Sequence, residues 1–219
     1  MGIRTDSRWA GVLTMVILTG ALGGAARAQV GGDHFSLSVD GGLMHSTSVR
    51  ALSTKPETAV ADGPQTSLCA GLSGIGEYLG GVAGIRGDLG LNIFGAAPIE
   101  AFLGGLAGFR LRFGNWRVQA TGELGEHLLW DIGAGEFQGH PHALLPFAGA
   151  SLELGHRDGV RPGHLGLSAF IRQDLDQRTV PAHADFISTG GGDTVHEVFD
   201  ATYSVGGTTI GLGVNVTTN

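Results

Sequence analysis

Residues 82–125 contain three successive runs in which every second side chain is apolar. In one of these runs Leu111 and Phe113 share a face, whereas Arg110 and Arg112 share the other. A period of two predicts β-strands with two chemically different faces. Because full charges lie in mid-strand while the opposite face is suited to hydrocarbon, the pattern is typical of a membrane-spanning β-barrel.

The amino-terminal segment has the features of a secretory signal peptide. Arg4 and Arg8 precede an apolar run over 9–22, and Ala26-Arg27-Ala28 matches the small-x-small cleavage pattern. The run is shorter than the about 20 apolar residues of a spanning helix. We expect cleavage after Ala28, which leaves residues 29–219 as a single barrel domain. An uncleaved anchor is less favoured, because no basic stop-transfer cluster follows.

Composition restricts the possible fold and partners. Glycine or polar residues interrupt every later apolar stretch, so no other transmembrane helix is expected. Glycine occurs 40 times in 219 residues, which disfavours helix. The net charge is −7, and an acidic exported chain is a poor binder of nucleic acid. The lone Cys69 cannot form an intramolecular disulfide, and we expect a small buried strand residue there.

The periodicity predicts eight strands of about ten residues each. They are expected at 34–44, 65–78, 82–94, 103–113, 116–126, 147–156, 164–174 and 199–216. In the last strand the apolar parity changes at Gly206-Gly207. We interpret this change as a β-bulge, because bacterial barrels normally have an even strand count. The alternative is a further hairpin and a ninth strand.

The expected connections alternate in length. Short turns at 80–81, 114–115 and 157–163 lie between longer loops at 45–64, 95–102, 127–145 and 175–196. Short periplasmic turns opposite longer external loops are the arrangement of outer-membrane barrels. The predicted fold is therefore all-β, an eight-stranded antiparallel up-and-down transmembrane β-barrel.

Aromatic residues are expected to form two girdles at the membrane interfaces. Those beside the short turns are Tyr78, Phe113 and Trp116, and those on the loop side are Phe94, Phe102 and Trp130.

On these patterns, residues 35–216 resemble the small OmpA- and OmpX-like outer-membrane β-barrels of Gram-negative bacteria. The resemblance implies an outer-membrane location, contact with outer-membrane lipid and insertion by the barrel-assembly machinery. Such proteins commonly end on an aromatic residue that assists assembly, whereas this sequence ends Val-Thr-Thr-Asn. The departure concerns the insertion route more than the fold.

The charged face of the strands is expected to fill the lumen. Its members are Asp40, Glu77, Arg86, Asp88, Arg110, Arg112, Arg117, Glu123, Glu153, Arg172 and Asp174. Acids and arginines are nearly balanced, and an eight-stranded barrel has room only for its own side chains. We therefore expect a network of ion pairs that plugs the lumen, with a narrow polar pore as the alternative.

Two sequence features raise the possibility of catalysis or metal binding. His140-Pro141-His142 lies near His127, Asp131 and Glu136, but the spacing matches no metal motif, so solvated loop residues are expected. A lipid-modifying barrel enzyme needs a serine nucleophile with histidine and acidic partners, and His45-Ser46 supplies only a dipeptide. No catalytic residue, metal or cofactor is predicted.

A second fold alternative is a soluble, exported lipocalin-like barrel, with the aliphatic face turned inward around an apolar ligand. Mid-strand arginines with acids at matching positions and a single lysine, Lys55, favour the membrane orientation. The expected function is a structural, adhesion or surface-binding role, with the long loops as the contact region. The sequence identifies no extracellular partner.

Overall fold

The computed structural model describes residues 34–55, 65–94, 99–130, 132, 142–157, 163–190 and 193–218. The expected signal peptide lies outside these residues. Across the described residues the strands are β1 (His34–Ser46), β2 (Val49–Lys55), β3 (Gln65–Tyr78), β4 (Gly81–Phe94), β5 (Ile99–Phe113), β6 (Trp116–Trp130), β7 (His142–His156), β8 (His164–Asp174), β9 (Arg178–Gly190), β10 (Asp193–Val205) and β11 (Thr208–Thr217). Within them, no helix is long and apolar enough to span a membrane.

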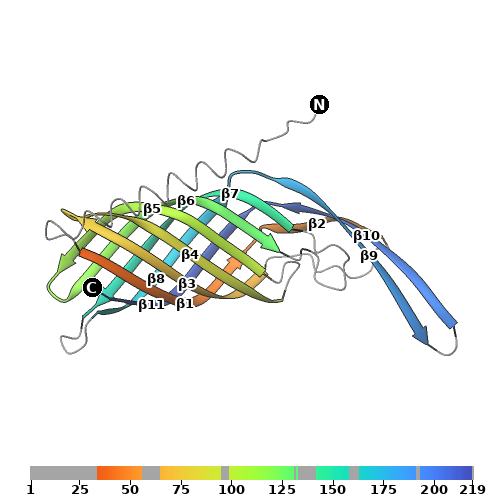
Figure 1. Ribbon diagram of the computed structural model, residues 1–219, viewed down its shortest axis with the longest axis horizontal. Helices are drawn as coiled ribbons and strands as arrows, with labels where there is room; N and C mark the ends of the chain where they lie inside the picture. Colours follow the sequence, from red (N-terminus) through yellow and green to blue (C-terminus); the bar gives the residue numbers. More distant parts are fainter. Residues whose placement is uncertain are drawn as a thin grey trace.

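Eight of these strands close into an antiparallel barrel (Figure 1). The order is β1-β11-β8-β7-β6-β5-β4-β3, and the barrel closes where β1 pairs with both β11 and β3. The predicted eight-stranded barrel is therefore confirmed. We call the end with the β3–β4, β5–β6 and β7–β8 connections the turn end, and the opposite end the loop end.

The alternation predicted from the sequence determines which side chains enter the lumen. In β6, Arg117, Gln119 and Glu123 are buried, whereas Trp116 and Leu124, at positions of the other parity, are exposed. Because side chains alternate with a period of two along each strand, residues paired across adjacent strands point to the same face of the barrel wall. The barrel therefore has a polar interior and an aliphatic exterior.

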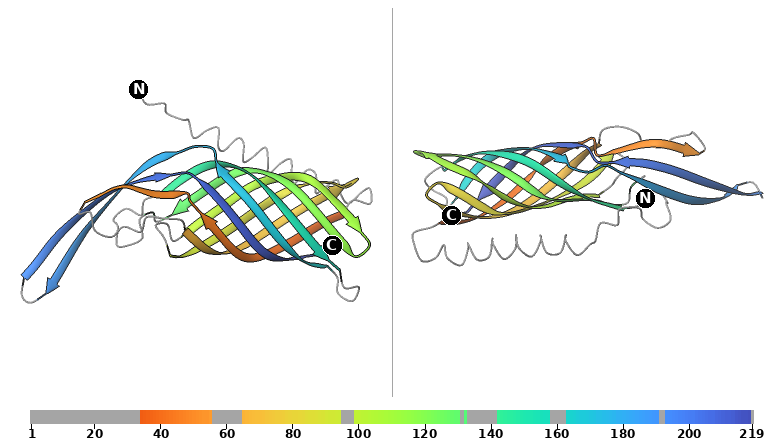
Figure 2. Two further views of the ribbon diagram at one scale, coloured as in Figure 1. Left: turned by 180° about the vertical axis from the view of Figure 1, so that it is seen from behind. Right: turned by 90° about the horizontal axis from the view of Figure 1, so that it is seen from above.

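Three strands form an extension beyond the loop end that the sequence did not predict. Their order, β2-β10-β9, repeats the order of the barrel strands β1-β11-β8 from which they continue (Figures 1 and 2). The predicted loop at 45–64 thus contains β2, and the predicted loop at 175–196 contains β9 and the start of β10. The rest of β10 lies within the predicted strand at 199–216, whose apolar alternation it carries at Phe199, Ala201, Tyr203 and Val205.

The junction between β10 and β11 lies at the predicted break, Gly206-Gly207, but it is not a bulge within one barrel strand. The two strands belong to different sheets, and β11 pairs with β1 and β8, so the alternative hairpin is also wrong. Gly206 has φ +118° and donates to the carbonyl of Ser48 at 2.7 Å. A side chain at Gly206 would collide with the carbonyl of Asp176. Glycine is therefore required where the strand leaves the barrel.

The β8–β9 junction carries a surface ion pair. Arg178 Nε donates to Asp176 Oδ2 at 2.9 Å, and this hydrogen bond holds the pKa of the Asp176 carboxyl below its usual range. Both side chains are about half exposed, so the pair contributes little to stability.

Barrel strands extend further toward the loop end than predicted. β5 begins at Ile99, β6 continues to Trp130, and β7 begins at His142, so the flanking loops are shorter than 95–102 and 127–145. The β3–β4 turn also falls one residue earlier than predicted, at Leu79-Gly80, with Leu79 at φ +50°.

Candidate functional site

The centre of the lumen is organised around Arg172 on β8. Its guanidinium donates to Asp88 Oδ2 at 2.5 Å and to Glu123 Oε2 at 2.8 Å. Three aromatic rings surround the same group, with centroids 4.2 Å (Phe170), 4.7 Å (Phe102) and 5.3 Å (Phe147) from Cζ. Two carboxylates and three ring faces together compensate the burial of this cation.

A second arginine joins the central cluster to the turn end. Arg86 donates from Nε to Asp88 at 2.9 Å, and its terminal nitrogens lie 3.6 Å from Asp40 and 3.8 Å from Glu153. All four side chains are buried. Charges from β1, β4 and β7 are thus linked across the barrel axis.

Near the turn end, Glu77 is shared by two arginines of β5. Arg110 Nη1 donates to Glu77 Oε2 at 2.9 Å, and Arg112 Nη1 donates to Oε1 at 2.5 Å. Arg110 is fully buried and also donates to Gln119 Oε1. The Arg112 side chain is 41% exposed, so it lines the mouth of the lumen and does not fill the interior as expected. Its position one residue from the end of β5 explains the difference.

Arg117 on β6 is the other arginine at this end. Its Nη2 donates to Thr217 Oγ1 at 2.8 Å and lies 3.4 Å from Glu153 Oε2. The residue is completely buried. Unlike Arg172, it has a single carboxylate within 4 Å among the described residues.

At the loop end, an acid–histidine–acid group occupies the lumen. His127 Nδ1 and Asp174 Oδ1 are 2.9 Å apart, while His127 Nε2 lies 3.8 Å from Glu100 Oε2. The other oxygen of Asp174 accepts from the backbone N–H of Gly207 at 2.9 Å, so this group contacts the β10–β11 junction. The His127 ring stacks on Phe102 at 3.9 Å.

Sequence reasoning missed the lumenal role of this group. His127 was expected in a solvated loop, Glu100 was overlooked within a predicted loop, and Phe102 was assigned to the loop-side girdle. All three are buried in the lumen, so the Phe102 and His127 assignments are wrong. Parity could have revealed them, because Glu100 and Phe102 share the phase of Arg110, and His127 shares that of Glu123.

An apolar cluster lies above the acid–histidine–acid group. It joins barrel residues to the extension, and its members are Val49, Leu129, Ile132, Ala143, Leu145, Ala182, Ala201, Tyr203 and Val205. Burial raises the pKa of Tyr203 in the extension to about 12. The extension therefore packs onto the wall at the loop end, and we call this cluster the apolar cap.

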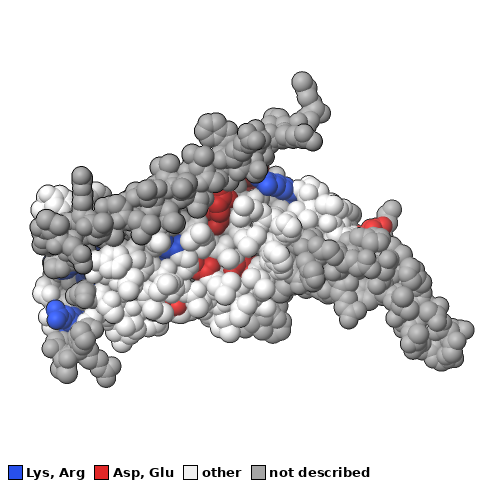
Figure 3. All heavy atoms as spheres, viewed as in Figure 1, with Lys and Arg blue, Asp and Glu red and all other residues white. Residues whose placement is uncertain are grey.

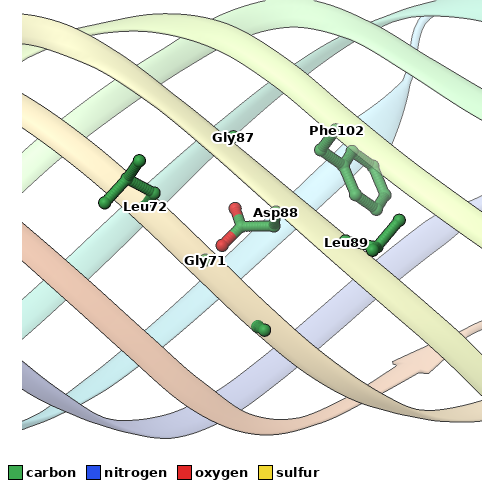
Figure 4. Close-up of a pocket in the computed structure, with 7 residues that line it drawn as sticks. Gly71, Leu72, Gly87, Asp88, Leu89 and Phe102 are labelled. Atoms are coloured by element: carbon green, nitrogen blue, oxygen red, sulfur yellow. The ribbon is translucent and has the colours of Figure 1, made fainter.

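Inward-facing glycines make space for the large lumenal side chains. Figure 4 shows Asp88 directed toward Gly71, where an added Cβ would collide with the carboxylate. A Cβ at Gly90 would likewise meet the tip of Met44, and one at Gly211 would meet the Phe170 ring. The high glycine content thus lets long charged and aromatic side chains lie flat across opposing strands.

The structure places most of the expected lumen residues inside the barrel, where their ion pairs form a central group around Arg86 and Arg172, a turn-end group around Glu77 and a loop-end group around His127. Those that are buried are Asp40, Glu77, Arg86, Asp88, Arg110, Arg117, Glu123, Glu153, Arg172 and Asp174. Of the expected interface aromatics, Tyr78, Phe113, Trp116 and Trp130 are exposed on the outer face. Phe94 ends β4.

Among the described residues, those considered for catalysis and metal binding are not brought together as a site. His45 is exposed and lies 3.1 Å from Thr66 Oγ1, whereas Ser46 is buried on the opposite face, where it accepts from Thr209. His142 stacks against Trp130. The other loop candidates, Asp131, Glu136 and His140, lie outside the described residues. Within the part of the chain that the structure describes, no three His, Cys, Asp or Glu side chains are grouped to hold a metal.

The outer wall presents a continuous aliphatic surface. Exposed residues such as Leu37, Leu72, Leu111 and Leu167 are each about half accessible, and Figure 3 shows few charges on the visible wall of the barrel. A soluble monomer rarely exposes an apolar area larger than a few hundred Å². The lipocalin-like alternative, with this face inward, is therefore wrong.

Comparison with known proteins finds likeness among solved structures. No protein-family model matches the sequence, and no curated protein matches it. A solved structure, that of Neisserial surface protein A (NspA), is similar with 13% sequence identity and a TM-score of 0.46, covering 85% of this chain and 99% of that chain.

The closed barrel, its lipid-compatible wall and its charged interior together determine where the protein resides. Only helices and closed barrels satisfy all backbone hydrogen bonds within lipid. Barrels with an apolar outer band and a polar interior are those of the outer membrane. The chain is a transmembrane β-barrel of the outer membrane.

Proposed function

We propose that this protein is a non-conducting outer-membrane barrel that presents the β2-β10-β9 extension at the cell surface for structural or adhesive contacts. The observation that carries the proposal is the continuation of three adjacent barrel strands into one sheet beyond the loop end (Figure 2). A sheet built onto the barrel wall is a more rigid contact surface than a free loop. Membership of the OmpA- and OmpX-like family is part of this proposal and rests on the strand pattern.

Closure of the lumen is the second part of the proposal. Central charges around Arg172 and Arg86 are paired across the axis, and an aromatic layer lies beside them. The apolar cap covers the loop end above the acid–histidine–acid group. Since eight strands enclose little space, these layers support a closed lumen and argue against a narrow pore.

The extension is anchored by backbone hydrogen bonds across each junction. Thr47 donates to Thr208 at 2.9 Å, Asp174 donates to Gly207 at 2.9 Å, and Gly206 donates to Ser48 at 2.7 Å. These bonds connect β1, β8 and β11 where the barrel ends and the extension begins. Forces applied to the extension would therefore be transmitted to the barrel wall, as an adhesive or structural contact requires.

In this proposal, outer-membrane lipid surrounds the aliphatic wall, and the barrel-assembly machinery inserts the chain. The extracellular partner binds the extension and the loops at the same end. No nucleic acid, metal or catalytic residue takes part.

A deletion strain complemented with variants would test the function. The trimmed variant replaces residues 185–198 of the β9–β10 hairpin with a short glycine turn. Its control carries the same glycine turn inserted in the 157–163 connection at the turn end. We expect the trimmed variant to reach the outer membrane and to lose cell aggregation or surface adherence, while the control retains both. Normal adherence of the trimmed strain at equal surface abundance would contradict the proposal.

A further inference from the structure

A groove of about 700 Å³ crosses the outer wall of the barrel from β1 to β6. Its sides are two rows of outward-facing side chains that pair across neighbouring strands. The row nearer the loop end includes His45, Ile210 and Ile171. The other row includes Leu43, Leu212 and Ala169. Backbone forms the floor, because the intervening residues Met44 and Phe170 are buried in the lumen.

Small residues widen the groove where it crosses β7 and β8. Ala150 pairs with Ile171 in the row nearer the loop end, and Ala169 pairs with Leu152 in the other row. The two alanines are therefore diagonal neighbours on opposite sides of the groove. The volume falls within the range of about 300–1,000 Å³ that small ligands occupy, so the groove has room for an apolar chain.

A row of polar side chains borders the groove on the side of the loop end. Thr208 Oγ1 donates to Gln173 Oε1 at 2.6 Å, and Thr47 Oγ1 donates to the carbonyl of Thr208 at 3.2 Å. His45 Nδ1 lies 3.1 Å from Thr66 Oγ1, so a lipid oxygen would meet His45 at Nε2. We call Thr47, Thr208 and Gln173 the polar border. It marks the level at which the wall changes from a hydrocarbon-facing to a polar surface.

The groove descends from this border into the apolar part of the wall. It begins at His45, close to the loop end of β1, and finishes at Ala120, in the turn-end half of β6. Five adjacent strands take part, and at about 4.8 Å between neighbours the groove is roughly 19 Å long. An acyl chain whose head lies at the polar border would follow the same course.

We propose that the groove binds one acyl chain of lipid A, the glycolipid of the outer leaflet. The polar border and His45 hydrogen-bond the ester, amide and hydroxyl groups at the head of the chain, and the two apolar rows enclose its tail. Lipid covers this wall in the membrane, so an acyl chain is the occupant that the surroundings supply. The choice of lipid A rests on the proposed function, in which the loop end faces the cell exterior.

Native mass spectrometry of the delipidated full chain, released from detergent micelles, tests the proposal. The protein is titrated with an equimolar mixture of lipid A and a saturated phosphatidylethanolamine, and the bound lipid is identified by mass. Ala150→Phe combined with Ala169→Phe fills the groove. The matched control is Ala83→Phe combined with Ala107→Phe, which pair across β4 and β5 elsewhere on the outer face.

We expect the wild type and the control to retain one lipid A in preference to the phospholipid, and the groove-filled variant to bind it about tenfold more weakly. Gln173→Leu removes an amide from the polar border and leaves the apolar groove intact. Its affinity for lipid A should fall about threefold, and it carries the test if the groove-filled variant does not fold.

Equal retention of lipid A by the groove-filled variant and its control, or unchanged affinity in Gln173→Leu, would overturn the proposal. Preference of the wild type for the phospholipid would overturn the assignment to lipid A. The variant trimmed in the β9–β10 hairpin keeps the whole groove and should bind lipid A normally. Loss of lipid binding and loss of adherence are therefore distinguishable.

Discussion

The two ends of the lumen are lined by the same alternating strands but carry opposite charge. Near the turns, Arg110, Arg112 and Arg117 face Glu77 and Glu153. Near the loops, the acids Glu100 and Asp174 share a single histidine, His127. Between them, Arg86 and Arg172 are held by carboxylates from several strands. Pairing is therefore most complete in the middle, where it ties opposite walls together.

Solvent access also differs between the ends. Arg112 reaches water at the turn end, whereas the apolar cap buries Glu100 and His127 completely. The free-energy cost of an unpaired charge is far lower at a solvent-exposed opening than beneath buried apolar side chains. Excess charge is thus in contact with solvent at one end, while at the other it is buried next to the junction of the extension.

The largest loss of stability is expected from a substitution at the centre of the lumen. Arg172→Leu would leave Asp88 and Glu123 without this shared partner, and losing one member of a buried ion pair costs about 3–5 kcal/mol. Urea unfolding in micelles measures the loss. The adjacent Ile171→Leu, on the outer face, should change stability by no more than about 0.5 kcal/mol. Equal stability of the two variants would show that the central pairs do not hold the barrel.

Removal of one carboxylate should change stability differently at the two ends of the lumen, by an intermediate amount. Glu77→Gln removes the carboxylate of both Arg110 and Arg112 and should destabilise the protein by about 3 kcal/mol. Glu100→Gln should be neutral or stabilising, because no arginine of the described residues lies within 4 Å of Glu100 and its buried charge is poorly compensated. The same unfolding assay compares them. Equal losses in the two variants would mean that the ends are electrostatically alike.

The smallest expected change in stability concerns the packing of the extension on the barrel. Burial raises the pKa of Tyr203 to about 12 from its ordinary value of 10.0, so its ionisation should reduce stability as the pH rises between these values. In a Tyr78→Phe background Tyr203 is the remaining tyrosine, and tyrosinate absorbance reports it alone. Ionisation near 10 would indicate that the extension does not pack on the apolar cap.

Sequence alone was sufficient for the barrel because its strands have two strongly different faces. The phase of Arg110 and Leu111 identifies inside and outside, and eight strands with alternating connections follow from the same signal. The expected lumen charges could be assigned by parity in mid-strand. Alternation is less informative at strand ends, where the Arg112 side chain reaches solvent although its position has the parity of the inward-facing residues.

The loop end was harder to predict for two physical reasons. Extending the alternation past the expected strand ends would have placed Glu100 and His127 in the lumen, but nothing in the sequence signals how far a strand continues beyond the membrane. The apolar alternation continues in parts of the extension, as in Val180 and Ala182 of β9 or Phe199 and Tyr203 of β10, but nothing in this alternation indicates that these segments form a separate sheet. Pairing of Arg172 with both Asp88 and Glu123 depends on register across distant strands, which no single strand encodes.

Conductance of the reconstituted protein tests the central claim most directly. If side chains fill the lumen from the Glu77 mouth to the apolar cap, purified barrel inserted in a planar lipid bilayer should show no steady ionic current. Insertion must be verified in the same preparation by protection of the barrel strands from protease. The account predicts inserted, silent barrels, and a stable, reproducible ohmic channel would contradict it.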